Sequence, residues 1–194
     1  QSSIPNFTQI SEALTNDYST SNTLGLPVRL HIFPGEWIKE SQPNGSFNIP
    51  SNMQLIGQSE SVVGENYTNG INGPAVSGAT ILNEVNVNDT TNSLVNLVIR
   101  GGIDIGGGSS NINVYNNFFA GIKDNSTNAF QGMTISGSSI EINNNVFWKF
   151  GRSSNIQDPA VGDFGQSTRI RNNILAESVL IGKYEKFQIS NFKF

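Results

Sequence analysis

Few side chains of this sequence have the type and spacing that catalysis or metal binding requires. The chain has one histidine, His31, and no cysteine. His31 lies in an alternating segment, Val28–Phe33, in which Leu30 and Ile32 take the opposite face, so we expect it to be a structural residue of the first strand rather than a base. No pair of His, Asp or Glu residues has metal-ligand spacing, and a thiolate site is excluded. The sequence therefore predicts no metal site and no cofactor.

The carboxylates and the tryptophans are the next candidates. Asp104, Asp124 and Asp163 would have to approach one another to bind calcium, and the sequence does not place them together. Trp37 and Trp148 could stack on sugar rings, because the face of an aromatic ring suits this contact, while core packing fits Trp148 equally well. A sugar-binding role for the two tryptophans remains one of two alternatives.

Two further motifs have ordinary explanations. The glycine-rich segment Gly101–Gly108 lacks the Lys-Ser/Thr of a phosphate loop, so it predicts a tight corner. Five Asn-x-Ser/Thr glycosylation motifs are present, at Asn6, Asn44, Asn66, Asn88 and Asn125. The 27 Asn and 34 Ser or Thr residues of the chain predict about five such motifs by chance, so their number is no evidence of glycosylation.

The elements that position these residues are β-strands. Ile, Val and Phe total 45 residues against 19 for Leu, Ala and Met, and Asn, Ser, Gly and Thr fill 81 of the 194 positions. This composition indicates an all-β chain with short strands and many corners. A net charge of −4, with 13% charged residues, offers no basic surface for nucleic acid, and no apolar run reaches the roughly 18 residues of a membrane span. We expect a single domain over residues 1–194.

An internal repeat is the most informative feature. The segments Ile112–Ile122, Ile140–Phe150 and Thr168–Ser178 each carry an Asn pair after a short alternation, with 28 residues between equivalent positions. A looser copy, Leu94–Arg100, precedes them by 21 residues, and Phe187–Phe194 is a truncated copy. This period predicts a solenoid of stacked β-coils. In such a stack the equivalent asparagines would form an internal ladder, whose members are Asn117, Asn145 and Asn173.

The N-terminal region has a different pattern. Phe7, Ile10 and Leu14 follow a helical spacing, and Asn6 stands three residues before Gln9, as in a capping box. We expect a short capping helix within residues 1–20, followed by five to six coils over residues 28–194.

These segments resemble the pectin lyase-like superfamily of right-handed parallel β-helices, and most closely its pectin methylesterase branch. The resemblance is carried by FTQISEAL (Phe7–Leu14), VRLHIFPGEWIKE (Val28–Glu40) and QLIGQ (Gln54–Gln58), which are similar in order and spacing to that family's entry helix, first strand and first coil. It implies a right-handed parallel β-helix, and here a degenerate and truncated member.

The resemblance also implies which residues would catalyse. The family uses two carboxylates, glutamines that bind the oxyanion, and an arginine that holds the nucleophile. Gln131 matches such a glutamine, but Gly132 stands where the first carboxylate belongs. Asp163 matches the second carboxylate, and the family's downstream arginine element has no counterpart. The family's mechanism cannot run on this set. If the chain is an enzyme, Asp163, Gln131 and Arg169 are its candidates.

The ends of the solenoid suggest a function. Phe187, Ile189, Phe192 and Phe194 continue the strand pattern to the last residue without a cap, and an uncovered end recruits another chain. Residues 1–97 carry a net charge of −6 and residues 98–194 one of +2, so opposite ends should attract. An ordinary charge imbalance on a monomer is the alternative.

From these features we expect a secreted or cell-surface, non-catalytic protein with a structural or adhesive role that self-associates end to end into filaments. Low charge and many Asn, Ser and Thr residues favour secretion. Two alternatives stay open: a small esterase or lyase acting on pectin-like polysaccharides, and a glycan-binding viral spike.

Overall fold

The computed structural model describes the central part of the chain. The described residues are 27–37, 46–58, 62–63, 76–81, 84–100, 102–120, 132–148, 161–163, 165–176, 181–183 and 188–190. This part consists of β-strands and contains no helix, which confirms the all-β class. The helix expected within residues 1–20 lies outside the described residues.

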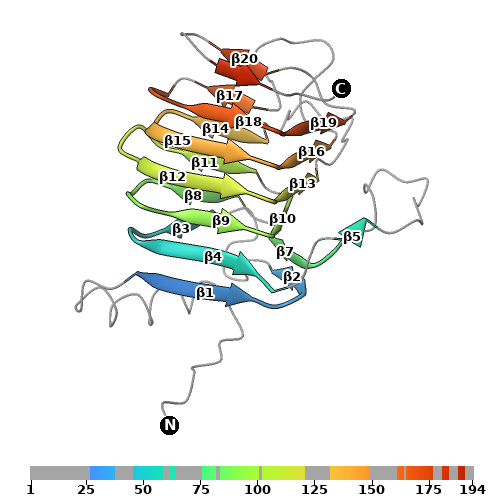
Figure 1. Ribbon diagram of the computed structural model, residues 1–194. Helices are drawn as coiled ribbons and strands as arrows, with labels where there is room; N and C mark the ends of the chain where they lie inside the picture. The colour runs from blue at the N-terminus through green and yellow to red at the C-terminus, as the bar shows by residue number, and fades with distance from the viewer. Residues whose placement is uncertain are drawn as a thin grey trace.

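Three parallel sheets make up the body of the molecule (Figure 1). In spatial order the first sheet contains β1 (Val28–Ile32), β4 (Met53–Gly57), β9 (Ser93–Val95), β12 (Ser110–Tyr115), β15 (Ser138–Asn143), β18 (Arg169–Arg171) and β21 (Gln188–Ser190). The second contains β2 (Gly35–Trp37), β7 (Ala79–Ile81), β10 (Val98–Ile99), β13 (Phe118–Ala120), β16 (Val146–Trp148) and β19 (Ile174–Ala176). The third contains β3 (Phe47–Ile49), β8 (Val85–Val87), β11 (Ile103–Ile105), β14 (Met133–Ile135), β17 (Val161–Asp163) and β20 (Ile181–Lys183).

The chain visits the three sheets in the same order again and again. Six successive passes run through first, second and third sheet, and β21 returns to the first sheet. A small antiparallel pair, β5 (Val62–Val63) and β6 (Val76–Ser77), interrupts the second pass. Figure 1 shows the passes stacked in chain order, from β1 to β20.

The register follows the sequence repeat. Val114 pairs with Ile142, and Ile142 pairs with Ile170, so the 28-residue period places equivalent residues directly opposite one another. The looser copy is offset by 20 residues rather than 21, because Leu94 pairs with Val114. The truncated copy is represented by β21, in which Ile189 pairs with Ile170.

Alternation along each strand sorts side chains between core and surface. Val114, Ile142 and Ile170 have no exposed surface, whereas their neighbours in the same strands face outward. The inward residues of all three sheets form one continuous aliphatic and aromatic cluster. Phe119 and Phe147 stack within it with ring centroids 4.5 Å apart, so the core repeats from pass to pass as the backbone does.

Candidate functional site

The second asparagine of each pair lies inside the stack. Asn117, Asn145 and Asn173 are buried, and the side chains of successive members are hydrogen-bonded, Asn117 to Asn145 and Asn145 to Asn173. The Asn145 Oδ1 accepts hydrogen bonds from the Asn117 backbone N–H at 2.9 Å and from the Asn117 Nδ2 at 3.1 Å. The Asn173 Oδ1 receives the same two bonds from Asn145, at 2.8 and 3.0 Å. The structure therefore brings together the three residues that the 28-residue spacing singles out.

The same amides also bind the preceding strand of the first sheet. The Nδ2 groups of Asn117, Asn145 and Asn173 donate to the carbonyls of Leu94, Val114 and Ile142, each at 2.9 Å. The Asn117 Oδ1 accepts a hydrogen bond from the Leu97 N–H at 3.0 Å. Leu97 occupies the position equivalent to Asn117 in the preceding pass, so an apolar residue replaces the asparagine there. The column formed by Asn117, Asn145 and Asn173 thus provides hydrogen-bond acceptors for buried backbone N–H groups at the corner between the first and second sheets.

The first asparagine of each pair has another role. Asn116, Asn144 and Asn172, and likewise Asn96 in front of Leu97, have φ between 53° and 57°, which is the left-handed region. Asparagine tolerates this region better than other non-glycine residues. The Asn-Asn pair therefore combines a sharp turn of the backbone with an inward amide. The sequence suggested the internal ladder but not this division between the two residues.

A pair of carboxylates at the third sheet, Asp104 on β11 and Glu84 directly before β8, was not anticipated from the sequence. Burial, followed by the negative charge of Asp104, raises the pKa of Glu84 above its ordinary value, and burial raises the pKa of Asp104. Asp104 lies on β11 next to Asn86 of β8, and the Asn86 Nδ2 donates to the Asn48 Oδ1 at 3.3 Å and to the Ser46 Oγ at 2.8 Å. The outer face of this sheet is thus lined by oxygen-bearing side chains. The partner of Asp104 is Glu84 from the preceding pass, which could have been found only by knowing the register.

Two of the three residues singled out by the pectin methylesterase resemblance, Asp163 and Arg169, lie on different sheets. Asp163 ends β17 of the third sheet and pairs with Ile135 and Lys183. Arg169 belongs to β18 of the first sheet and forms an exposed ion pair with Glu141 at 3.4 Å. Gln131 lies outside the described residues. Of these three candidates, Arg169 is thus engaged by the carboxylate of Glu141.

The aromatic candidates and His31 also have defined places. Trp148 is buried in a small cluster with Val98 and Phe118 on the second sheet, as the packing alternative requires, so it offers no exposed ring for a sugar. Trp37 ends β2, and its side chain is outside the described set. The Gln58 Nε2 donates to the His31 Nδ1 at 2.5 Å across neighbouring strands, which is a structural contact.

The chain matches no protein-family model, no curated protein and no solved structure. Within the described ranges, no three His, Asp or Glu side chains are grouped as a metal site would require. No helix there has the length and apolar character of a membrane span.

Proposed function

We propose that this protein is a right-handed parallel β-helix with a structural or adhesive role, secreted or displayed on a cell surface, which self-associates end to end into filaments. The repeated pass through three parallel sheets supports the β-helix, since crossovers between parallel strands are right-handed in nearly all proteins. Abundant Asn, Ser and Thr with few charges support an extracellular location.

The observation that carries the proposal is the pairing of the strands at the two ends of the stack. Within the described part of the chain, β1, β2 and β3 each pair on one side only, and so do β21, β19 and β20. Among the described residues no strand lies beyond these edges, and an edge of this kind is a template for another strand. Because all three sheets are parallel, one end of a copy can continue the sheets of the other end of the next. A head-to-tail contact that does not close produces a filament.

Charge supports the same contact. Among the described residues, Glu36, Glu84 and Asp89 outnumber Arg29 in the first half of the chain. In the second half Arg100, Arg169, Arg171 and Lys183 outnumber Asp104, Glu141 and Asp163. Since the passes are stacked in chain order, the charge difference lies along the stack and favours opposite ends meeting.

Blocking the outer edge of β1 tests the proposal. The Val28 N–H donates to the Asn52 carbonyl, and the Ile32 carbonyl accepts from the Gln58 N–H, both at 2.9 Å, so alternate residues of β1 face β4. The N–H of Arg29 therefore points to the outer edge. Arg29→Pro removes this donor and keeps the bonds to β4, and proline is tolerated on edge strands. Arg29→Ala is the matched control, because it removes the same side chain and keeps the N–H.

We expect the unmodified protein to form concentration-dependent filaments in sedimentation and negative-stain electron microscopy. Arg29→Pro should remain monomeric, and Arg29→Ala should still assemble. A protein that stays monomeric at high concentration, or an Arg29→Pro variant that assembles like the parent, contradicts end-to-end association. A parallel trimer would instead favour the viral-spike alternative.

A further inference from the structure

Three large apolar side chains are exposed among the described residues, and all three lie at one corner of the stack. Phe33 is 58% exposed, Ile174 42% and Tyr115 39%. Phe33 follows β1 and precedes β2, Tyr115 ends β12, and Ile174 begins β19 directly after Asn173. Each of them therefore stands at or beside the corner between the first and second sheets.

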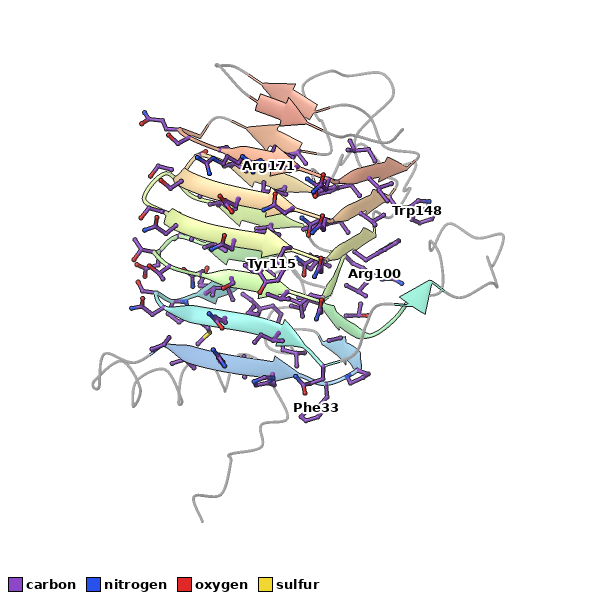
Figure 2. All side chains as sticks on the ribbon, in the orientation of Figure 1. Phe33, Arg100, Tyr115, Trp148 and Arg171 are labelled. Atoms are coloured by element: carbon purple, nitrogen blue, oxygen red, sulfur yellow. The ribbon has the colours of Figure 1, made fainter. Side chains whose placement is uncertain are left out.

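The three residues differ in their place along the stack. Phe33 belongs to the first pass, Tyr115 to the fourth and Ile174 to the sixth, whose β19 is the last described strand of the second sheet. Figure 2 shows Phe33 beside β1 at the end of the stack and Tyr115 midway along it. Single exposed apolar residues are common on monomers. Here, however, an apolar residue is exposed at each end of the same corner, as a contact between opposite ends requires.

A cation stands beside Ile174. Arg171 ends β18 three residues before it and is exposed. No hydrogen bond or ion pair of the Arg171 side chain occurs among the described residues. A guanidinium group and a branched aliphatic side chain together suit an aromatic ring, which stacks on the first and packs against the second. The C-terminal end of the corner thus fits the aromatic residue that the N-terminal end exposes.

A coaxial contact between two copies would bring these groups together. At the C-terminal end β21 adds one strand to the first sheet beyond β18, so β1 of the next copy would lie beyond β21. With strands about 4.8 Å apart, the corner that carries Phe33 would be two spacings, about 10 Å, from the corner that carries Ile174. Phenylalanine and isoleucine side chains that extend toward each other bridge such a separation between Cα atoms.

The same contact selects one rotational setting of the two copies. Because the stack has three sheets, the first sheet of one copy could be aligned with any of the three sheets of the next. Only the setting in which the first sheet continues the first sheet brings Phe33 and Ile174 to one corner. The other two settings turn Phe33 to a different corner. Burial of either side chain favours association about tenfold or more, so the aligned setting is preferred.

We infer that two copies of this chain meet coaxially with their first sheets aligned. The residues that meet are Phe33 of one copy and Arg171 and Ile174 of the next, which we call the joint corner. The occupant is a second copy because the charge difference along the stack attracts opposite ends and not like ends. The inference rests on the proposed end-to-end association and adds to it the alignment of the copies.

Cysteine cross-linking tests the alignment, because the chain has no cysteine of its own. Phe33→Cys/Ile174→Cys, treated with a short bismaleimide under assembling conditions, should give a ladder of covalent oligomers on a denaturing gel. Cross-linking traps the contact even where the substitutions weaken it. Asn48→Cys/Ile174→Cys is the matched control, because Asn48 is exposed in the first pass but on the third sheet, and it should give little product.

Phe33→Cys alone is a second control. It should give no product, since a head-to-tail contact never brings this residue of two copies together.

Sedimentation of single variants gives an independent measurement. Phe33→Asp and Ile174→Asp should each raise the protein concentration required for assembly about tenfold or more, and Arg171→Gln about two- to fivefold. Tyr115→Asp is the matched control, because Tyr115 is exposed at the same corner but midway along the stack. It should change this concentration less than about twofold. Circular dichroism and thermal unfolding verify that each variant is folded.

The outcomes separate this inference from the proposed function. If the unmodified protein does not assemble, end-to-end association is wrong and the joint corner falls with it. The alignment alone is overturned if the unmodified protein assembles and Phe33→Asp and Ile174→Asp assemble as readily. It is also overturned if Asn48→Cys/Ile174→Cys cross-links as efficiently as Phe33→Cys/Ile174→Cys. Product from Phe33→Cys alone would indicate a two-fold contact and overturn both.

Discussion

At the scale of single residues, the buried asparagine amides act as substitutes for main-chain pairing. Asn145 uses both of its polar atoms, since its Oδ1 accepts from Asn117 and its Nδ2 donates to the Val114 carbonyl and to Asn173. No apolar side chain of similar size can replace these bonds. Leu97 is tolerated because it stands at the end of the column, where its N–H is already accepted by Asn117.

Removal of one amide from the middle of the column should therefore be costly. Asn145→Ala leaves the buried N–H of Asn117 without its acceptor and removes one donor from the Val114 carbonyl, and we expect the free energy of unfolding to fall by about 2 to 4 kcal/mol. Urea denaturation measures the loss. Asn144→Gly is the control, because Asn144 is exposed at a φ of 57°, which glycine adopts freely, and its effect should stay within about 0.5 kcal/mol. Equal losses in the two variants would show that the turn, and not the buried amide, stabilises the corner.

The carboxylate pair on the third sheet makes stability depend on pH. The pKa values of Glu84 and Asp104 are raised in the folded state, so between the unfolded and folded pKa values the folded chain holds more protons than the unfolded one. These two groups lower the free energy of unfolding at pH values above their folded pKa, and this effect disappears below their unfolded pKa. Stability due to this pair therefore falls as pH rises.

Asp104→Asn should relieve that unfavourable contribution. We expect the variant to gain unfolding free energy relative to the parent at pH 7, and to gain less at about pH 3, where both carboxyl groups are protonated. Chemical denaturation of both proteins at the two pH values measures the difference. A gain that is the same at both values would mean that the charge of Asp104 has no part in it.

At the scale of elements, the spacing between neighbouring passes depends on small residues at the corner between the third and first sheets. Ser109, Gly137 and Gly165 lie in one column there, linked through the Ser138 N–H to the Ser109 carbonyl and the Gln166 N–H to the Gly137 carbonyl, both at 2.9 Å. A Cβ on Gly137 would stand 2.6 Å from the Ser109 carbonyl oxygen, and one on Gly165 2.5 Å from the Gly137 carbonyl oxygen. These positions require glycine because two backbones approach each other closely.

Gly137→Ala should push the two passes apart at this corner. We expect a loss of about 1 to 3 kcal/mol in unfolding free energy, visible as a lower midpoint in thermal denaturation. Gly107→Ala is the matched control, because its added Cβ comes no closer than 3.9 Å to another atom, and it should be neutral or slightly stabilising. Similar losses in both variants would contradict the close-approach argument.

The same elements show what could be predicted from the sequence. The 28-residue period identified which residues of β12, β15 and β18 lie opposite one another, because identical pass lengths leave the register no freedom. Earlier passes differ in length: Leu55 pairs with Leu94 across 39 residues that include β5 and β6. The pairing of these earlier strands therefore could not be predicted from a constant period. Glu84 beside Asp104 was missed for this reason. Trp148 could not be assigned, since alternation does not show whether an outward side is covered.

At the scale of the whole molecule, the charge distribution and the strand edges that have no described neighbour would make separable contributions to the proposed end-to-end assembly. Coulomb attraction between unlike ends weakens with salt, whereas main-chain pairing at the edges does not. Filaments that form at low salt and shorten as salt is added, while Arg29→Pro remains monomeric throughout, would show both contributions. Insensitivity to salt would remove the axial charge from the explanation and leave the edges.

The uniform direction of the strands has a consequence for any fibre built in this way. Every strand of the three sheets runs parallel to its neighbours, so the surface beyond β1 is chemically unlike the surface beyond β21. Two-fold symmetric pairs would bring like edges together as antiparallel neighbours, so they cannot continue the parallel order of the sheets. Such a fibre is polar, with a fast-growing and a slow-growing tip, and a subunit that carries Arg29→Pro would cap one tip and leave the other free to elongate.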